Sequence, residues 1–445
     1  MRSHPSVPRR TLVVAIAVAS VTSLPAARAE TLEELTARVQ ALTTQIIELE
    51  RQQRESERRQ ASAPQAAVTA GATPGSFKLP GSNTSVTLGG YVKLDATYSN
   101  PSAGVDSAAD LFLQPNAIAV GPAARDNERR QVKFGARESR LFARTSTPTS
   151  WGELTTYVEG DFYGADGNES VSNSSGLRLR HAYGSLGPLL AGQTWTNFMY
   201  VPALPETLDF GGPVGQIFAR QAQVRWTKPF GDADSSTRGQ WSVALENPES
   251  VFAAPGAPGF RADDDRFPDL TGQLVLDTAK GKVAVSGVLR QIRADARSPA
   301  VVDQAWGGAI NVSGVMPLNG QDDLRFTVAA GNGIGRYSDG FFADGVVGTD
   351  GRIRLPREWA WYAAYRHFWT EQLRSSVVLS SAQESNPADT PASTNRSTRS
   401  AHLNLIWSPV ANTDLGLEYI HASRKTEDGL TGQLGRLQAS ARYRF

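Results

Sequence analysis

The residues of this 445-residue chain best suited to chemistry are arginines, which recur at alternate positions of short apolar segments. Residues 177–180 read Leu-Arg-Leu-Arg, and side chains alternate along a strand, so both arginines share one face. A guanidinium binds carboxylates and phosphates through two parallel hydrogen bonds and stays charged at any physiological pH. The pattern therefore indicates recognition of anions. The arginines placed in this way include Arg140, Arg144, Arg178, Arg180 and Arg225.

Acidic residues occupy similar positions. Glu159 and Asp161 alternate with Val158, Gly160 and Phe162. Carboxylates that face arginines across a narrow passage create a transverse field, which orients polar solutes and selects them by charge. The alternative is that these groups pair with one another as structural wall residues. A formal net charge of only +1 favours that alternative for some of them.

Residues for catalysis are poorly represented. The chain has five His and no Cys, and the absence of Cys excludes disulfides, thiolate metal sites and thiol catalysis. No H-E-x-x-H, G-x-S-x-G or phosphate-loop motif occurs. Only His402 and His421 could serve a lipid hydrolase built on the outer face of a barrel. We therefore expect no enzyme activity, no catalytic residue, no metal site and no cofactor.

The elements that must position the arginines are strands, because from Ser85 to Phe445 the hydrophobic pattern has a period of two. One face of each strand is apolar and the other polar, as in transmembrane barrels. The sixteen predicted strands lie near 86–98, 131–145, 151–163, 176–186, 189–197, 217–228, 237–247, 270–278, 282–293, 304–315, 323–331, 357–369, 372–382, 399–408, 413–425 and 433–445.

The connections between these strands support a membrane barrel. Short connections such as 187–188 and 370–371 follow even-numbered strands, whereas long ones such as 99–130 and 332–356 follow odd-numbered strands. Periplasmic turns and extracellular loops of bacterial barrels alternate in this way. The chain also ends in Phe445 on an alternating apolar face, which is typical of barrels inserted into the outer membrane.

The segments before the barrel differ from it in pattern. Residues 1–29 combine basic residues, an apolar run and an A-x-A site, which indicates a signal peptide. Residues 30–60 carry apolar residues at heptad positions a and d, which predicts a periplasmic coiled coil. A single amphipathic helix packed on its own protein is the alternative. Residues 61–84 are expected to be a linker, and 85–445 the barrel.

One long connection, residues 198–216, joins the fifth and sixth predicted strands and contains three prolines. We expect it to fold inward and narrow the channel, although an ordinary surface loop is the alternative. Its acidic residues are Glu206 and Asp209. The predicted pore-lining or solute-contacting residues are then Arg140, Arg144, Glu159, Asp161, Arg178, Arg180, Arg225, Glu206 and Asp209.

Several motifs resemble those of DcaP-like trimeric outer-membrane porins, from the start of the barrel to its end. They include Gly89-Gly90-Tyr91-Val92-Lys93-Leu94-Asp95, Tyr157-Val158-Glu159-Gly160-Asp161-Phe162, Leu177-Arg178-Leu179-Arg180-His181-Ala182-Tyr183-Gly184 and Gly192-Gln193-Thr194-Trp195. The resemblance implies a homotrimer of 16-stranded barrels with periplasmic coiled-coil extensions. It also implies an Arg-rich constriction that prefers negatively charged solutes such as dicarboxylates. The heptads alone are equally compatible with a dimer.

The sequence therefore predicts an all-β fold, a 16-stranded antiparallel porin-type barrel with an N-terminal helical coiled coil. The expected function is passive diffusion of small anionic solutes across the outer membrane of a Gram-negative bacterium. The expected partners are copies of the chain, outer-membrane lipid and lipopolysaccharide, and peptidoglycan as a further candidate, with no nucleic acid. The alternatives are a structural barrel whose coiled coil tethers the envelope, and a barrel lipid hydrolase.

Overall fold

The structure is a computed structural model in which the chain divides into two compact units, residues 1–67 and 68–445. The residues that it describes are 32–62, 68–101, 111–125, 130–165, 171–232, 235, 237–254, 257–262, 264–297, 300–338 and 341–445. The predicted signal peptide, residues 1–29, lies outside the described residues.

The first unit contains one long helix, α2 (Leu32–Ser62). Its heptad residues Val39, Leu42, Ile46 and Leu49 are 44–64% exposed within the single chain. The apolar seam is therefore exposed within the helix's own unit, and the coiled coil stays a prediction. Among the described residues, no helix is long and apolar enough to cross a membrane.

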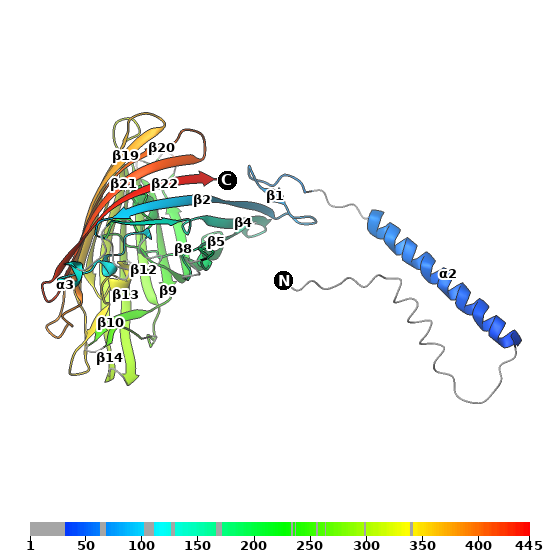
Figure 1. Cartoon of the computed structure of the whole chain (residues 1–445), viewed down its shortest axis with the longest axis horizontal. Helices are drawn as coiled ribbons and strands as arrows, with labels where there is room; N and C mark the ends of the chain where they lie inside the picture. The colour runs from blue at the N-terminus through cyan, green and yellow to red at the C-terminus, as the bar shows by residue number, and fades with distance from the viewer. Residues whose placement is uncertain are drawn as a thin grey trace. The chain divides into compact units, whose positions relative to one another are not determined.

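The second unit is a closed barrel of sixteen antiparallel strands, as predicted. Figure 1 shows the last strand, in red, beside the first, in cyan-blue, and their ladder from Tyr91–Arg444 to Ser99–Arg436 closes the barrel. The barrel strands are β2 (Ser85–Ser99), β3 with β4 (Gln131–Gly135 and Arg140–Thr149), β5 (Gly152–Asp161), β6 (Arg178–Leu186), β7 (Leu189–Trp195), β8 (Arg220–Phe230), β9 (Arg238–Glu246), β12 (Asp269–Thr278), β13 (Gly281–Arg297), β14 (Ala300–Pro317), β15 (Asp323–Asn332), β18 (Arg357–Phe368), β19 (Leu373–Ser385), β20 (Asn395–Trp407), β21 (Thr413–Thr426) and β22 (Thr431–Arg444).

The predicted strand 131–145 is interrupted in the structure. Both β3 and β4 pair with β2, but residues 136–139 between them leave the ladder. The interruption turns Glu138 toward the interior, where it forms an ion pair with Lys93. The period-two pattern could not reveal this, because an interrupted strand keeps its alternation on both sides.

Alternation along the strands separates an apolar outer face from a polar inner face. In β22, Leu437 and Tyr443 are 42% and 54% exposed, whereas Arg436 and Gln438 are each 1% exposed. Arg on the lipid face near the membrane midplane would cost about 2–4 kcal/mol. The inward placement of the polar residues follows from that cost.

The long connections, and for β1 the segment before the barrel that was expected to be a linker, carry the remaining elements, which the sequence pattern did not predict. Four short strands form a separate sheet: β10 (Ser250–Ala254), β11 (Ala257–Ala262), β16 (Gly345–Val347) and β17 (Ile353–Arg354). The others are β1 (Phe77–Lys78), α3 (Pro122–Arg125), η2 (Pro115–Ala117), η3 (Val201–Ala203) and η4 (Gly335–Tyr337). Each has six residues or fewer, which is too short for a hydrophobic period to be recognised.

The ladder between β6 and β7 depends on one glycine. Gly192 has a φ of +130°, and a Cβ there would lie 2.6 Å from the Cα of Tyr183 on the neighbouring strand. We predict that Gly192→Ala lowers the free energy of unfolding in urea by about 1–3 kcal/mol, because an L side chain is strained in that backbone region.

The matched control is Gly272→Ala in β12, where the nearest atom to an added Cβ is 3.9 Å away. Its free energy of unfolding should stay close to that of the wild-type protein. Equal effects of the two substitutions would contradict the assignment of strain to Gly192.

Candidate functional site

The connection between β7 and β8, residues 196–219, lies inside the barrel. Its backbone is held by side chains of strands that are distant in the barrel order. Asn311 of β14 donates to the carbonyl of Phe198 at 3.0 Å, and the Tyr362 hydroxyl of β18 donates to the carbonyl of Ala203 at 3.0 Å. The connection, which we call the inner loop, therefore crosses the lumen.

Glu418 of β21 is the central anchor of the inner loop. Its carboxylate accepts the backbone N–H of Leu208 at 2.7 Å and that of Asp209 at 3.3 Å. The side chains of His402 and Asn404 lie 3.1 and 3.0 Å from the same carboxylate. Glu418 is fully buried, so all of its hydrogen-bonding capacity is directed to the loop and its neighbours.

The two acidic residues of the inner loop also hold it in place. Glu206 forms two hydrogen bonds with Arg374, at 2.7 and 2.9 Å. Burial would raise the pKa of Glu206, but Arg374 and Arg366 outweigh it and keep that pKa below its usual value. Asp209 accepts the backbone N–H groups of Leu113 and Gly212 at 2.8 and 3.0 Å.

Asp209 was predicted to contact solute, and its surroundings argue for a structural role instead. It is only 3% exposed, and both of its oxygens accept backbone N–H groups. Burial raises the pKa of Asp209 to about 6. A carboxyl so enclosed serves the loop's conformation, whereas Glu206 keeps an open edge, with 20% of its side chain exposed.

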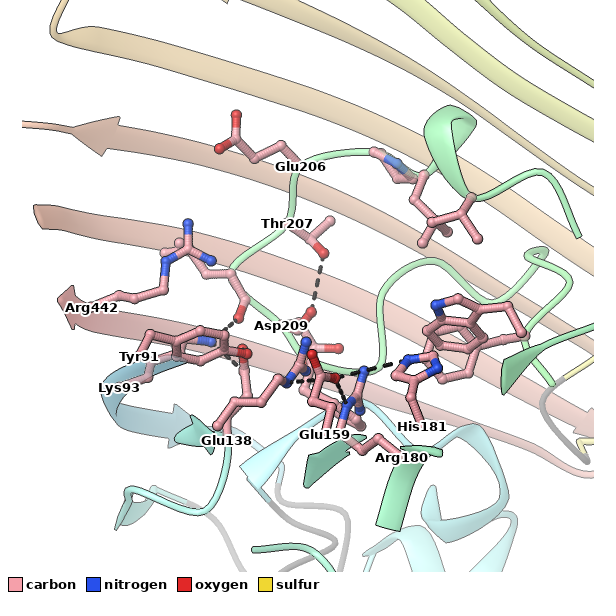
Figure 2. Close-up of a pocket in the computed structure, with 18 of the residues that line it drawn as sticks. Tyr91, Lys93, Glu138, Glu159, Arg180, His181, Glu206, Thr207, Asp209 and Arg442 are labelled. Atoms are coloured by element: carbon pink, nitrogen blue, oxygen red, sulfur yellow. Dashed lines mark hydrogen bonds and ion pairs between the residues drawn. The ribbon is translucent and has the colours of Figure 1, made fainter. Parts of the chain in front are cut away.

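A cavity of about 610 Å³ lies between the inner loop and the barrel wall. In Figure 2 the loop carrying Glu206, Thr207 and Asp209 runs past the wall residues Glu159 and Arg180. The charged residues that line this cavity are Lys93, Glu138, Arg140, Glu159, Arg180, Glu206, Asp209, Asp414 and Arg442, and His181 lines it as well.

One side of the wall carries five of the predicted residues in one ion-pair cluster. Arg178 binds Asp161 at 2.7 and 2.9 Å, and Arg180 binds Glu159 at 2.7 Å and Asp161 at 3.1 Å. Arg140 lies 3.5 Å from Glu159. The arginines and carboxylates predicted to share a face are thus brought together, and they pair with one another.

His181 joins this cluster although simple alternation would turn it outward. The ladder between β5 and β6 pairs Glu159 with His181 and Gly160 with Leu179, so Arg180 is an extra residue. Such a β-bulge lets two consecutive residues face the same side. Arg180 and His181 therefore both line the cavity.

A second basic group gathers around Asp414, a residue that sequence reasoning did not select. Arg442 binds Asp414 at 2.7 Å and Arg374 lies at 3.3 Å, while Arg444 also pairs with it. The arginines were recognisable from alternation in the sequence. Asp414 was not, because it stands at the start of β21, next to a turn.

Arg144 and Arg225 stand apart from these clusters. Both face the lumen by register, Arg144 opposite Tyr157 and Arg225 opposite Leu190, but neither lines the cavity. Neither forms an ion pair within the described part of the chain. The structure therefore separates them from the other predicted residues.

Ser400, His402 and Glu418 have the distances of a Ser-His-acid triad. The two histidine contacts, to the Ser400 hydroxyl and to the Glu418 carboxylate, are both 3.1 Å. However, the three residues are at most 5% exposed, and Ser400 also contacts Ser380 at 2.6 Å. Their position beneath the inner loop indicates an anchor, and it is not the outer face that a lipid would reach.

The anchoring role of Glu418 is testable by labelling, since the chain has no Cys. We predict that Glu418→Ala makes a single Cys introduced by Thr207→Cys react faster with a thiol reagent, because two backbone hydrogen bonds of the loop are lost. The rate should rise by about tenfold or more if each lost bond to the charged carboxylate is worth about 1.5 kcal/mol. Glu418→Gln, which keeps one acceptor, should give a smaller rise, and equal rates in all three proteins would contradict the anchor.

The comparisons with known structures agree with this architecture. The outer membrane channel DcaP of Acinetobacter baumannii superposes with a TM-score of 0.71 at 24% sequence identity, over 85% of this chain and 100% of that one. An anion-selective porin from Comamonas acidovorans has a TM-score of 0.51 at 13% identity, over 81% and 100%. OmpT of Vibrio cholerae has a TM-score of 0.51 at 11% identity, over 82% and 99%. No curated protein sequence matches the chain.

The family assignment rests on a match along nearly the whole sequence. The family model described as DcaP outer membrane protein matches residues 25–445. That match covers the barrel and the preceding helix, and it confirms the resemblance inferred from the motifs. The chain belongs to the DcaP outer membrane protein family, and it is a porin-type channel of the Gram-negative outer membrane.

Proposed function

We propose that the channel conducts small solutes passively and prefers anions, dicarboxylates among them. The observation that carries this proposal is the arrangement of the ion pairs, in which the arginine is usually the more exposed partner. Arg178 is 30% exposed and its partner Asp161 0%, while Arg442 is 27% exposed and its partner Asp414 7%. Two pairs of this cavity depart from the arrangement: Glu206 is 20% exposed against 12% for Arg374, and Glu159 is 9% exposed against 3% for Arg180.

This arrangement supports anion preference despite the near-neutral net charge. A solute in the lumen meets guanidinium groups first, and the carboxylates behind them hold those groups in place. Charge placed at close quarters along a pore selects ions by sign. Basic residues from three strands, β4, β6 and β22, line the same cavity, which suits a solute with two carboxylates.

No chemical step belongs to this proposal, in which solutes diffuse through and no bond is made or broken. The triad-like group of Ser400, His402 and Glu418 is assigned to loop anchoring because of its burial. Arg140, Arg178, Arg180, Glu159 and Glu206 are proposed to contact or orient solute. Asp161 is proposed to hold Arg178 and Arg180 in place without contacting solute.

We further propose that the channel is a homotrimer and that α2 takes part in self-association. The exposed apolar seam of α2 supports this, since Leu42 and Ile46 lie on one face and are 46% and 44% exposed. About two and a half heptads are marginal alone, so the barrels must supply the rest of the association. Lipid and lipopolysaccharide would contact the outer face, and peptidoglycan could contact the periplasmic segment.

A structural tether is the second candidate function, and the same exposed seam favours it. Deletion of residues 30–75 distinguishes conduction by the barrel from tethering by the helix. We predict that the deleted protein still conducts, because the inner loop and both basic groups lie within residues 93–444. The measurement is the single-channel conductance of the deleted and full-length proteins in planar bilayers. If the deleted protein forms an intact barrel but does not conduct, the prediction that the barrel conducts without residues 30–75 is contradicted.

Anion preference itself is tested by the reversal potential in a KCl gradient. In the wild-type channel the anion should be the more permeant ion. We predict that Arg442→Gln with Arg444→Gln lowers the anion-to-cation permeability ratio by about twofold or more at 0.1 M salt, and by less at 1 M, because the screening length falls from about 10 to about 3 Å. The control, Arg442→Lys with Arg444→Lys, keeps both charges and should keep most of the preference. Cation preference in the wild-type channel would overturn the proposal.

A further inference from the structure

Arg220, the first residue of β8, differs from the other arginines of the lumen. Sequence reasoning did not select it, because it stands at the junction of the inner loop and the strand. Its guanidinium lies over the ring of Trp195 at 4.6 Å and close to that of Phe218 at 5.7 Å. The two rings hold the side chain in place through apolar contact and cation–π attraction.

The guanidinium of Arg220 has no ionic partner in the described part of the chain. Its Nη1 atom is buried and has no hydrogen-bond acceptor there. The charged groups near enough to act on it are Arg140, Arg178, Arg180 and Asp161. Asp161 already binds Arg178 at 2.7 Å and Arg180 at 3.1 Å, so three positive charges remain around Arg220 with their carboxylates already engaged.

Arg290 in the same barrel shows the ionic partners that a fully buried arginine has, whereas Arg220 is half-buried. Arg290 of β13 is 0% exposed, and it lies 2.6 Å from Asp344 and 3.4 Å from Asp269. A charge removed from water without such partners is costly, and an added counter-charge recovers part of the cost. Arg220 is therefore a position where an anion from solution would be stabilised.

A second cavity of about 290 Å³ opens beside Arg220. Among the described residues that line it, the charged ones are Arg178 and Arg220, and none is a carboxylate. The rest are two amides and five aromatic side chains, Gln114, Asn116, Phe112, Trp195, Phe210, Phe218 and Phe341. The cavity therefore combines a guanidinium that has no ionic partner among the described residues with an apolar enclosure.

The second cavity adjoins the larger one. Trp195, Phe210 and Phe218 line both of them. Phe210 belongs to the inner loop, and its ring lies 6.4 Å from that of Phe218. An anion held at Arg220 therefore stands next to the cluster of Arg140 and Arg180 in the larger cavity.

We propose that Arg220, Trp195 and Phe218 form a subsite for a monocarboxylate with an apolar body. The carboxylate binds the guanidinium and the apolar body lies against the rings. Because its charge is uncompensated, Arg220 is also a residue that determines the anion preference of the channel. The inference rests on the proposed function, since it names a solute class for the same lumen.

The chemistry explains why such an anion fits better here than elsewhere in the lumen. At Arg178 and Arg180 a solute carboxylate must compete with Asp161 and Glu159, which already bind those guanidiniums. At Arg220 no competitor is present among the described residues. A hydrogen bond to a charged group is stronger than one between neutral groups, and the rings add the burial of apolar surface.

The test uses the full-length channel in planar bilayers, with hexanoate as the probe and acetate as the matched anion that lacks the apolar body. Hexanoate should reduce chloride current in the wild-type channel at lower concentration than acetate. Arg220→Gln should raise the half-blocking concentration of hexanoate by about tenfold, the equivalent of 1.4 kcal/mol. It should also lower the anion-to-cation permeability ratio.

Two further variants separate the charge from the rings. Phe218→Ala should weaken block by hexanoate and leave the effect of acetate unchanged, whereas Arg220→Lys should keep the permeability ratio and weaken the block. Arg225→Gln removes a guanidinium of the same strand that lines neither cavity and forms no ion pair among the described residues, so it should leave block by hexanoate at the wild-type level. Because these variants keep different parts of the site, they remain informative if Arg220→Gln does not fold.

The outcomes distinguish the inference from the function on which it rests. A wild-type channel that prefers cations contradicts the proposed function. An anion-preferring channel in which Arg220→Gln changes neither the permeability ratio nor block by hexanoate overturns the inference alone. Equal block by hexanoate and acetate in the wild-type channel overturns the apolar part of the subsite.

Discussion

The hydrogen bonds from the backbone of Leu208 and Asp209 to the buried carboxylate of Glu418 are the interaction on which the functional interior depends. They hold the inner loop across the lumen, and the loop in turn supplies one wall of both cavities. Glu206 and Asp209 reinforce the same placement through Arg374 and through backbone N–H groups. Acidic residues expected to face solute are therefore used largely to shape the space in which solute moves.

In the lumen, how deeply the charged side chains are buried matters more than how many of each sign there are. The chain carries 45 basic and 44 acidic residues, so composition alone selects no ion. The ion pairs place most carboxylates deeper than their arginines, with Asp161 at 0% and Asp414 at 7% exposure. A near-neutral protein can in this way present a positive surface to a solute, because the compensating charges lie behind that surface.

Polar groups of the interior differ in whether a solute can reach them. Ser400, His402 and Glu418 reproduce the distances of a hydrolytic triad, but they are enclosed by the inner loop. Arg220 shows the opposite case, a guanidinium that lines a cavity and has no ionic partner among the described residues. Accessibility, more than residue type, decides which group can meet a solute.

The sequence by itself determined the sixteen strands, the inward face of Arg140, Arg178 and Arg180 and the family, because period-two alternation and local motifs are properties of neighbouring residues. Tertiary structure alone decided which charges compensate one another. The bulge that turns His181 inward, the pairing of Asp414 with Arg442 and the contact of Arg220 with Trp195 all depend on the register between neighbouring strands. Alternation within one strand leaves no trace of that register, because the residues that face each other are set only when the strands pair.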